Sequence, residues 1–324
     1  MDFGLDMLRQ SLVTETMVVS PLSVIFALAL VQVGAKGGTK EQINEAISDG
    51  GKRFSIEKQY ADMIIEKYSA KVEALDFDQI KQAAETIDAF VRETTEGKIK
   101  NFIKEDTVSG ALSLIINAIY FKAKWEHEFS KELIANRTFH SAANKKKKIE
   151  FLNEDDRLCN YTEYEDMEVL SLPYKDTSYA LNIILPKRRY ALDILRRKLT
   201  GATIQKLLSK LQPTLLTISF PKMKIETDFE LKEALIAMGV TEMFSNSANL
   251  TGIATYPPLK VSDAAHKAII EVDESGTVAA AATVFKMAMV TSVGRPVTRR
   301  FVADHPFIFV LTKDKNPLFM GQFA

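Results

Sequence analysis

Apolar residues recur at helical spacing through the first third of the chain. Residues 2–12 carry leucines on one face, and residues 78–95 repeat Ala, Ile, Phe and Val in the same way. Between them, the uncharged run 17–35 has Pro21 where it suits the first turn of a helix. Two shorter helices are expected at residues 40–47, where Thr39 and Gln42 have capping-box spacing, and 56–68. The pattern therefore predicts five helices before residue 96.

Short β-like runs dominate the rest of the chain. Residues 111–121, rich in Leu and Ile without helix stops, predict a central strand. Further strands are expected at residues 149–152, 167–173, 180–186, 214–220 and 259–272 and, as a C-terminal hairpin, 307–311 and 318–323. Helices are predicted at 191–199, 202–211 and 229–237, the last capped by Asp228. Helices come first and strands later without regular alternation, so the fold class is α+β.

The composition limits the possible partners. The 324 residues include 42 Lys and Arg against 42 Asp and Glu, so we expect no nucleic-acid partner. The single cysteine, Cys159, cannot form an internal disulfide, and no secretory signal is recognisable before residue 17. A cytoplasmic protein is therefore expected. The run 17–35 is long enough to span a membrane, but polar residues interrupt it, so a buried core helix is preferred and no membrane partner is expected.

Motifs of catalysis are missing from the sequence. It contains no Gly-rich phosphate loop, nucleophile elbow or paired C-x-x-C. The four histidines lack metal-ligand spacing and are interpreted as structural, so no catalytic residue, metal or cofactor is predicted: His127, His140, His266 and His305. The basic run at residues 145–148 could be a nuclear signal or a polyanion contact, but it is interpreted as a mobile solvated turn, because like charges in a block repel and stay hydrated. Residues 196–198 are interpreted in the same way.

Residues 271–291 do not look like a globular core. Split by parity from Thr277, one set of residues is wholly uncharged, and the other carries the only charge, Lys286. A strand with period two would therefore show one face suited to lying over a core, beside the strand that ends at Val272. The alternative is an Ala-rich helix, since Ala is the best helix former.

Several motifs, in order along the chain, resemble those of one family. They are the Glu-Ser-Gly-Thr-Val-Ala-Ala-Ala-Ala-Thr run at 274–283, Ser-Pro-Leu-Ser at 20–23, the run 117–125 ending in Trp125, the run 301–307 and Leu-Phe-Met-Gly at 318–321. Together they resemble the serpins, a family of protease inhibitors. The resemblance implies one domain over residues 1–324, with three β-sheets, about seven to nine helices and an exposed reactive-centre loop at about 274–297.

The resemblance also implies a mechanism. A target serine protease, or a cysteine protease, would cleave the loop and form an acyl-enzyme. It would then be trapped when the loop inserts as a new strand into the large sheet. The hinge residues that match the family are Glu274, Gly276, Thr277, Ala279, Ala280, Ala281 and Ala282. The resemblance further implies an intracellular, monomeric inhibitor rather than an enzyme.

Counting as the family does, sixteen residues beyond Glu274, places the scissile bond at Val290-Thr291, with Met289 as the alternative primary residue. A β-branched aliphatic residue there suits an elastase-like pocket, and Met289 a chymotrypsin-like one. Trypsin-like targets would require a basic residue such as Lys286 or Arg295 instead.

Two groups of residues match positions that control the large sheet in the family. Ser20, Ser23, Asn117 and His266, the latch cluster, resemble the group that controls sheet opening. Trp125, Lys222 and Glu274, the entry cluster, resemble the group where the loop first enters. Buried polar groups must be hydrogen-bonded, so the latch cluster can exchange partners as strands separate.

One departure from the family pattern lies near residues 48–53. The family has two further helices and a strand of the large sheet there, so an internal deletion is predicted. A sheet that lacks a strand accepts an inserted loop less readily, which keeps a non-inhibitory binding or chaperone-like protein as the alternative function. An unrelated hydrolase is the third hypothesis, and it lacks a nucleophile motif.

Overall fold

Two β-sheets and eight α-helices form the part of the chain that the computed structural model describes: residues 1–47, 75–253, 256, 258–276 and 298–324. The helices are α1 (Asp2–Arg9), α2 (Pro21–Gly34), α3 (Gly37–Ile47), α5 (Ile80–Thr94), α6 (Glu105–Val108), α7 (Leu192–Lys198), α8 (Gly201–Ser209) and α9 (Leu231–Ala237). Two 3₁₀ turns, η1 (Lys131–Leu133) and η2 (Glu242–Phe244), complete the helical part. The α+β class predicted from the sequence is confirmed.

The smaller sheet has the order β2-β9-β8. Its strands are β2 (Leu114–Phe121), β9 (Asp263–Val272) and β8 (Met223–Glu230). Strand β2 runs parallel to β9 over eight residue pairs, and β8 runs antiparallel to β9. Among the described residues, β2 is therefore an edge strand with one partner.

The larger sheet follows the path β1-β12-β11-β6-β5-β4-β7-β10, with β3 paired to β4. These strands are β1 (Met17–Val19), β12 (Asn316–Phe323), β11 (Phe307–Lys313), β6 (Tyr179–Pro186), β5 (Met167–Pro173), β4 (Lys145–Tyr164), β7 (Gln212–Pro221), β10 (Arg299–Val302) and β3 (Ala135–Ala142). Three sheets were expected, and the described residues form two. The reason is the 20-residue strand β4, which shifts register between Glu154 and Arg157 and stays paired with β7 on both sides of the shift.

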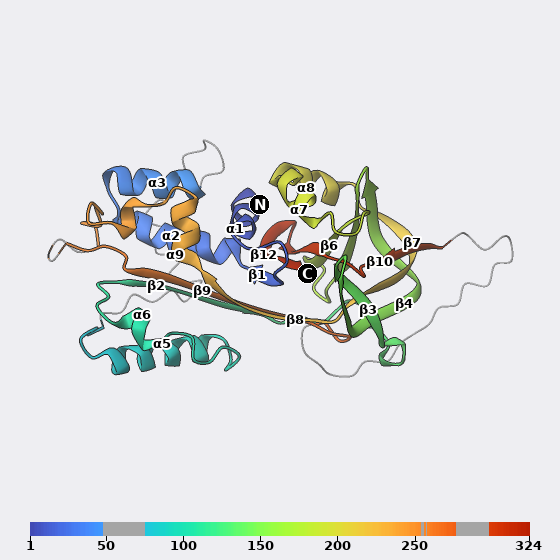
Figure 1. The fold of residues 1–324 in the computed structure, drawn as a ribbon, viewed down its shortest axis with the longest axis horizontal. Coiled ribbons are helices and arrows are strands. Elements are labelled where there is room, and N and C mark those ends of the chain that lie inside the picture. The colour runs from blue at the N-terminus through green and yellow to red at the C-terminus, as the bar shows by residue number, and fades with distance from the viewer. Residues whose placement is uncertain (48–74, 254–255, 257, 277–297) are drawn as a thin grey trace.

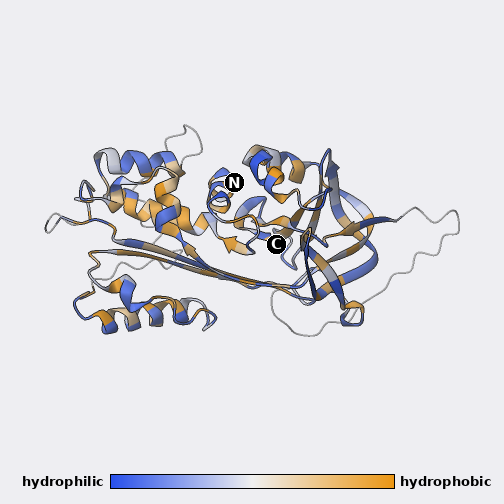
Figure 2. Ribbon diagram, in the orientation of Figure 1, coloured by the Kyte–Doolittle hydropathy of each residue, from blue (hydrophilic) through white to orange (hydrophobic). Residues whose placement is uncertain are grey.

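Each face of the smaller sheet packs against a different core. Helix α5 lies below it in Figure 1 and shares a core with even-numbered residues of β2, Ile116, Ala118 and Tyr120. Odd-numbered Ile119 and Phe121 pack against the core of the larger sheet. Period-two alternation thus places both faces of β2 against apolar side chains. Helix α2, hydrophobic along most of its length in Figure 2, contributes to a third core.

The run 17–35 forms β1 and the whole of α2 rather than one long helix. Ser20 caps α2 by accepting a hydrogen bond from the amide of Ser23, and Pro21 is its first residue. Among the described residues, no helix combines the length and apolar character needed to cross a membrane.

Two predicted helix caps were wrong. Thr39 lies inside α3, and its hydroxyl donates to Glu242 Oε2 at 2.6 Å instead of capping the helix. Asp228 belongs to β8 and pairs with Lys267 at 3.0 Å, so α9 begins three residues later. In both cases a long-range partner satisfies the side chain that local spacing assigned to a helix end.

The basic run at residues 145–148 lies in a strand and not in a turn, and in each basic run one residue, Lys147 or Arg196, is packed while the others are exposed as interpreted. Residues 145–148 begin β4 and pair with β3, and the Lys147 ammonium lies 5.1 Å from the Phe139 ring centroid and 4.9 Å from that of Phe323. Arg196 is buried, and its guanidinium donates to the carbonyls of Leu8, in the last turn of α1, and of Ser11, beyond the end of that helix. Aliphatic stems and delocalised charge allow these residues to pack where an apolar or carbonyl partner is present.

Candidate functional site

The candidate site begins where β2 and β9 end, at the entry cluster. Trp125 follows β2 and is 2% exposed. Its ring stacks on Tyr174 at 4.5 Å between centroids, and its Nε1 donates to the carbonyl of Asp273 at 2.8 Å. The Trp125 amide donates to the Ser275 carbonyl at 3.1 Å. These contacts fix the chain that leaves β9 against the chain that leaves β2.

A partly buried ion pair holds the same turn from the side of β8. Lys222 Nζ lies 2.9 Å from Glu274 Oε2, and 27% and 18% of the two side chains are exposed. Burial, the largest single effect, raises the pKa of Glu274, but the hydrogen bond and charge of Lys222, a backbone hydrogen bond and the charge of Lys131 together outweigh it and keep the pKa below its usual value. Burial, the largest single effect, lowers the pKa of Lys222, but the hydrogen bond to Glu274 and the charges of Glu274, Glu150 and Asp273 together outweigh it, so the pKa is raised. Both directions indicate a charged pair at neutral pH.

Gly276 ends the described part of this turn. It forms antiparallel bridges to Lys124, just after β2, and to Asp273, just after β9. Its φ is 120°, and a Cβ there would lie 2.4 Å from the carbonyl oxygen of Ala123. Glycine is therefore required at this position for both conformation and space. The chain leaves Gly276 between the ends of two strands that run parallel to each other.

The latch cluster lies at the middle of the β2–β9 ladder, where Asn117 is directly paired with His266. The Ser20 amide donates to His266 Nε2 at 3.0 Å, so this nitrogen carries no proton. The proton is therefore on Nδ1, which donates to Asn117 Oδ1 at 2.6 Å. Ser23 Oγ donates to the same oxygen at 2.8 Å. The structure thus brings the four predicted residues together.

The latch cluster holds the start of α2 against three strands, β2, β9 and β12. The Asn117 amide nitrogen donates to the Ser23 carbonyl at 3.0 Å, and Ser20 Oγ donates to the Leu318 carbonyl at 2.7 Å. His266 is 1% exposed, and burial lowers its pKa to about 4. A neutral His266 is what the hydrogen bonds require, because its two nitrogens have different partners. Separating β2 from β9 would break the Asn117–His266 contact.

Several residues of this site were missed from the sequence. Tyr174 stacks on Trp125, Phe129 packs against the same ring, and Ser275 is buried with its amide bonded to Asp273 Oδ1 at 2.9 Å. The Asp-x-Ser-Gly pattern at 273–276 is typical of a turn and could have indicated the last contact. The aromatic contacts join segments far apart in the chain, for which local spacing gives no signal.

The described residues include only part of the predicted hinge and none of the reactive bond. Glu274 and Gly276 are described above. Thr277, Ala279, Ala280, Ala281, Ala282, Met289, Val290 and Thr291 lie outside the described residues. The chain is described again from residue 298, and β10 begins at Arg299 in the larger sheet, parallel to β7.

Comparison with known proteins identifies the class to which this fold and site belong. The family model of serpins, described as serine protease inhibitors, matches residues 1–51 and 49–324. Serpin B4 of Homo sapiens is 32% identical over 85% of this chain and 72% of its own length. The leukocyte elastase inhibitor of Xenopus laevis is 30% identical over 96% of this chain and 93% of its own. The chain therefore belongs to the serpin family, which consists of protease inhibitors rather than enzymes.

Solved structures agree with this assignment. The crystal structure of Serpin48, a highly specific serpin of the insect Tenebrio molitor, has a TM-score of 0.85 at 27% identity and covers 99% of this chain and 94% of that chain. Uncleaved ovalbumin has a TM-score of 0.84 at 25% identity, over 100% of this chain and 97% of that chain. The serpin fold expected from the sequence is confirmed.

The alignments also bear on chain length. Iripin-8 of Ixodes ricinus is 29% identical over 366 aligned positions, more than the 324 residues of this chain. The relative thus has residues without a counterpart here. The two stretches matched by the family model meet at residues 49–51. The deletion near residues 48–53 stays a prediction.

Proposed function

We propose that this protein inhibits a serine protease as a suicide substrate, through cleavage of the loop at about 274–297 and its insertion between β2 and β9. The observation that carries the proposal is the position of Gly276. It is bridged to the ends of both strands, so a chain that turned back from it would run antiparallel to each. The latch cluster supports the proposal, because it joins the two strands by side chains that can exchange partners.

The energetics favour insertion. Opening the sheet breaks one ladder of eight residue pairs, whereas an inserted strand gains a ladder on each side. Roughly eight additional backbone hydrogen bonds at about 1 kcal/mol each, plus burial of the uncharged face that begins at Thr277, supply on the order of ten kcal/mol. That is enough to distort a bound enzyme, whose own stability is about 5–15 kcal/mol.

We infer the targets from the sequence around the reactive bond. Val290 as the primary residue suits an elastase-like protease, and Met289 a chymotrypsin-like one. Two relatives are named for inhibitors of such proteases, the leukocyte elastase inhibitor of Xenopus laevis and antichymotrypsin-2 of Bombyx mori. A cysteine protease remains a second target class. Action as a monomer in the cytoplasm is part of the proposal, supported by the lone Cys159.

The test is incubation with elastase, chymotrypsin and trypsin, followed by denaturing electrophoresis. A covalent adduct that survives denaturation is expected with elastase or chymotrypsin and not with trypsin. Thr277→Arg places a charge on the inserting face and should turn the protein into a cleaved substrate. Val278→Arg, of opposite parity, is the matched control and should still form the adduct. The proposal would be contradicted if no adduct formed with any of the serine and cysteine proteases tested.

The alternative is a serpin-fold protein that binds partners without inhibiting. The edge position of β2 in a sheet of three described strands favours it, since a smaller sheet supports an inserted strand less well. We propose that the predicted deletion near residues 48–53 is the cause. Simple loop cleavage by all three proteases, without adduct or gain in heat resistance, would support this alternative.

A further inference from the structure

Three hydrogen bonds close the end of the β2–β9 ladder that lies opposite the entry cluster. The Ser262 amide donates to the Ser113 carbonyl at 2.8 Å, and Ser262 Oγ accepts from the Leu112 amide at 2.7 Å. Ser113 Oγ donates to the Lys260 carbonyl at 2.9 Å. We call these four residues the far clamp. They join the chain that enters β2 to the chain that enters β9.

Gly276 fixes the register that a strand inserted between β2 and β9 would take. It is bridged antiparallel to Lys124 on one side and to Asp273 on the other. These two partners are 149 positions apart, as are the paired residues of β2 and β9 along the whole ladder, which has no register shift. Antiparallel pairing that continues from Gly276 therefore reaches the first pair of the ladder ten residues later, at Lys286.

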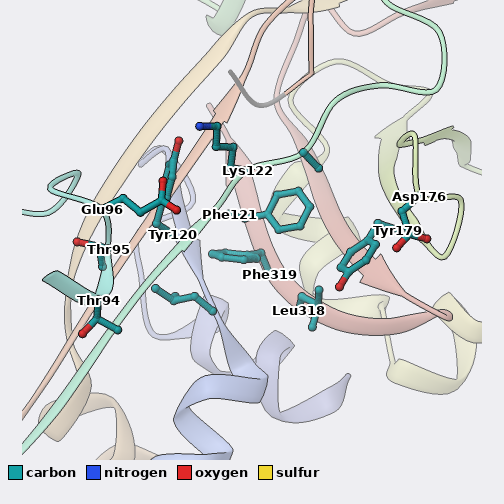
Figure 3. A pocket seen from close by; sticks show the side chains of 12 residues that line it. Thr94, Thr95, Glu96, Tyr120, Phe121, Lys122, Asp176, Tyr179, Leu318 and Phe319 are labelled. Atoms are coloured by element: carbon teal, nitrogen blue, oxygen red, sulfur yellow. The ribbon is translucent and has the colours of Figure 1, made fainter. Parts of the chain in front are cut away.

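The faces of the strands agree with this register. Tyr120 and Phe121 point to opposite sides of β2 in Figure 3, because successive side chains of a strand alternate. Directly opposed residues of neighbouring strands share a face. The register thus places Thr277 and the uncharged residues that alternate with it on the side of Phe121, over the core of the larger sheet. It places Lys286 on the side of Tyr120, toward α5.

Lys286 would meet the carboxylate of Asp263, which pairs with Leu114 at the start of the ladder. Directly opposed residues have Cβ atoms about 4.5–5.5 Å apart, so the two side chains come within ion-pair distance. Asp263 is half-buried, and its Oδ1 accepts from the next amide of the chain at 2.8 Å. The ion pairs that β9 forms with described residues involve Lys267 and Glu271, and not Asp263.

The other charges near this end of the sheet leave Asp263 available. Lys267 lies on the same face, four residues along β9, and is already paired with two carboxylates of β8. Lys232 belongs to α9, which shares a core with Ala264 on the opposite face, and its ammonium donates to a backbone carbonyl at 2.8 Å. Helix α6, on the α5 side of the sheet in Figure 1, begins with two exposed carboxylates and one exposed lysine, Glu105, Asp106 and Lys104. A lysine that arrives on this face therefore meets more negative than positive charge.

We propose that the far clamp holds β2 to β9 before the reactive loop inserts, and that an ion pair between Lys286 and Asp263 replaces it afterwards. An inserted strand moves its two neighbours from about 4.8 Å to about 9.6 Å apart. The far clamp lies one residue beyond the pair that Lys286 reaches, so its hydrogen bonds break. Ser113, Ser262 and Asp263 are thus positioning residues of insertion. This inference rests on the proposed function, because it assumes insertion between β2 and β9.

The far clamp should stabilise the uncleaved protein and not the cleaved one. Ser113→Ala together with Ser262→Ala removes two hydrogen bonds that exist only before insertion. The uncleaved variant should melt about 3 °C lower than the uncleaved wild type, and the two proteins cleaved near Val290 should melt alike. Ser109→Ala is the matched control and should change neither form, since Ser109 is exposed and its hydroxyl makes no hydrogen bond with described residues.

The ion pair should show the opposite dependence. Lys286→Glu faces Asp263 only after insertion, and like charges directly opposite each other are destabilising. The gain in melting temperature on cleavage should therefore be about 2 °C smaller in this variant than in the wild type. Adding Asp263→Lys restores opposite charges and should recover most of the gain. Adding Glu105→Gln instead removes an exposed carboxylate of α6, and this control should recover none of it.

Circular dichroism melting of each variant before and after limited cleavage measures these shifts. Equal losses in both forms of the double serine variant would overturn this inference alone, because the wild type would still gain heat resistance on cleavage. A loss in Lys286→Glu that Asp263→Lys does not recover would do the same. No gain in the cleaved wild type would overturn insertion itself, and this inference with it.

Discussion

The hydrogen bonds of the latch cluster depend on the protonation state of one residue, His266. Its Nε2 accepts from the Ser20 amide, and its Nδ1 donates to Asn117. A second proton would convert Nε2 into a donor facing another donor. Because His266 is 1% exposed, its uncompensated positive charge would destabilise the folded state. The cluster is therefore built for a neutral imidazole.

This dependence predicts a loss of stability in mild acid. The pKa of His266 is about 4 in the folded protein against 6.5 for the unperturbed group. Its contribution is thus intact above about pH 6.5 and is lost as the pH falls toward 4. Urea unfolding should show a loss of about 2 kcal/mol between about pH 7.5 and pH 5. His266→Gln should be less stable than the wild type at neutral pH. Its free energy of unfolding should change much less with pH over this range. An equally steep profile in that variant would contradict the assignment.

The ion pair of the entry cluster predicts a measurable coupling. Lys222→Ala, Glu274→Ala and the double variant form a thermodynamic cycle, and we expect a coupling of about 1–2 kcal/mol in the free energy of unfolding. The control is Lys224–Glu271, an ion pair of 3.0 Å between β8 and β9 in which the lysine side chain is 72% exposed. Its coupling should be about 0.5 kcal/mol or less. Equal couplings would mean that burial adds nothing at the entry cluster.

At the scale of elements, the end of β9 is fixed to the end of β2 through a glycine. The Ser275 carbonyl accepts from Trp125, the Glu274 carbonyl accepts from Phe129 at 2.8 Å, and Gly276 bridges both strand ends. These bonds hold the first residues of the predicted hinge in place.

Substitution of Gly276 tests this arrangement. Gly276→Ala would bring a methyl group within 2.6 Å of three backbone atoms of residues 123–125 at a φ of 120°, so we expect a loss of about 3 kcal/mol or more. Gly110→Ala is the control, because Gly110 also has a positive φ, 70°, but no atom within 4 Å of the added group. About 1 kcal/mol is expected there from conformation alone. Similar losses, measured by urea unfolding, would show that space is not limiting at Gly276.

At the scale of the whole molecule, the segment between Gly276 and residue 298 begins at the smaller sheet and ends at the larger one. The chain leaves the smaller sheet at Gly276 and is next described at residue 298, beside the larger sheet. The proposed function requires the uncleaved protein to be metastable, with insertion between β2 and β9 as the state of lower energy. Stored energy of this kind is a property of the molecule and of no single contact.

Cleavage should release that energy as heat resistance. Cutting the loop near Val290 is expected to raise the unfolding temperature by roughly 15 °C or more, given on the order of ten kcal/mol gained on insertion. Circular dichroism melting before and after limited cleavage measures the change. The cleaved Thr277→Arg variant is the control and should gain little. An unchanged melting temperature in the cleaved wild type would exclude insertion.

Local sequence patterns predicted much of the fold and part of the site. Regular alternation and helical spacing predicted the bounds of α5 and of the strands β2, β5 and β6 to within a few residues. They failed for residues 145–148, where lysines lie in a strand, and for Asp228, which pairs across a sheet. In those places, pairing with a distant segment outweighed the local preference of the side chains.

By itself, the sequence predicted the α+β class through its periodicity, and the resemblance of its motifs to the serpin family singled out the residues of the latch and entry clusters. Only the tertiary structure decided that His266 is neutral between Ser20 and Asn117, that Gly276 lies between the ends of β2 and β9, and that the far clamp closes the opposite end of their ladder. Each depends on contacts between residues separated by many positions. Such contacts are set by the packing of whole elements, which the spacing of residues along the chain does not specify.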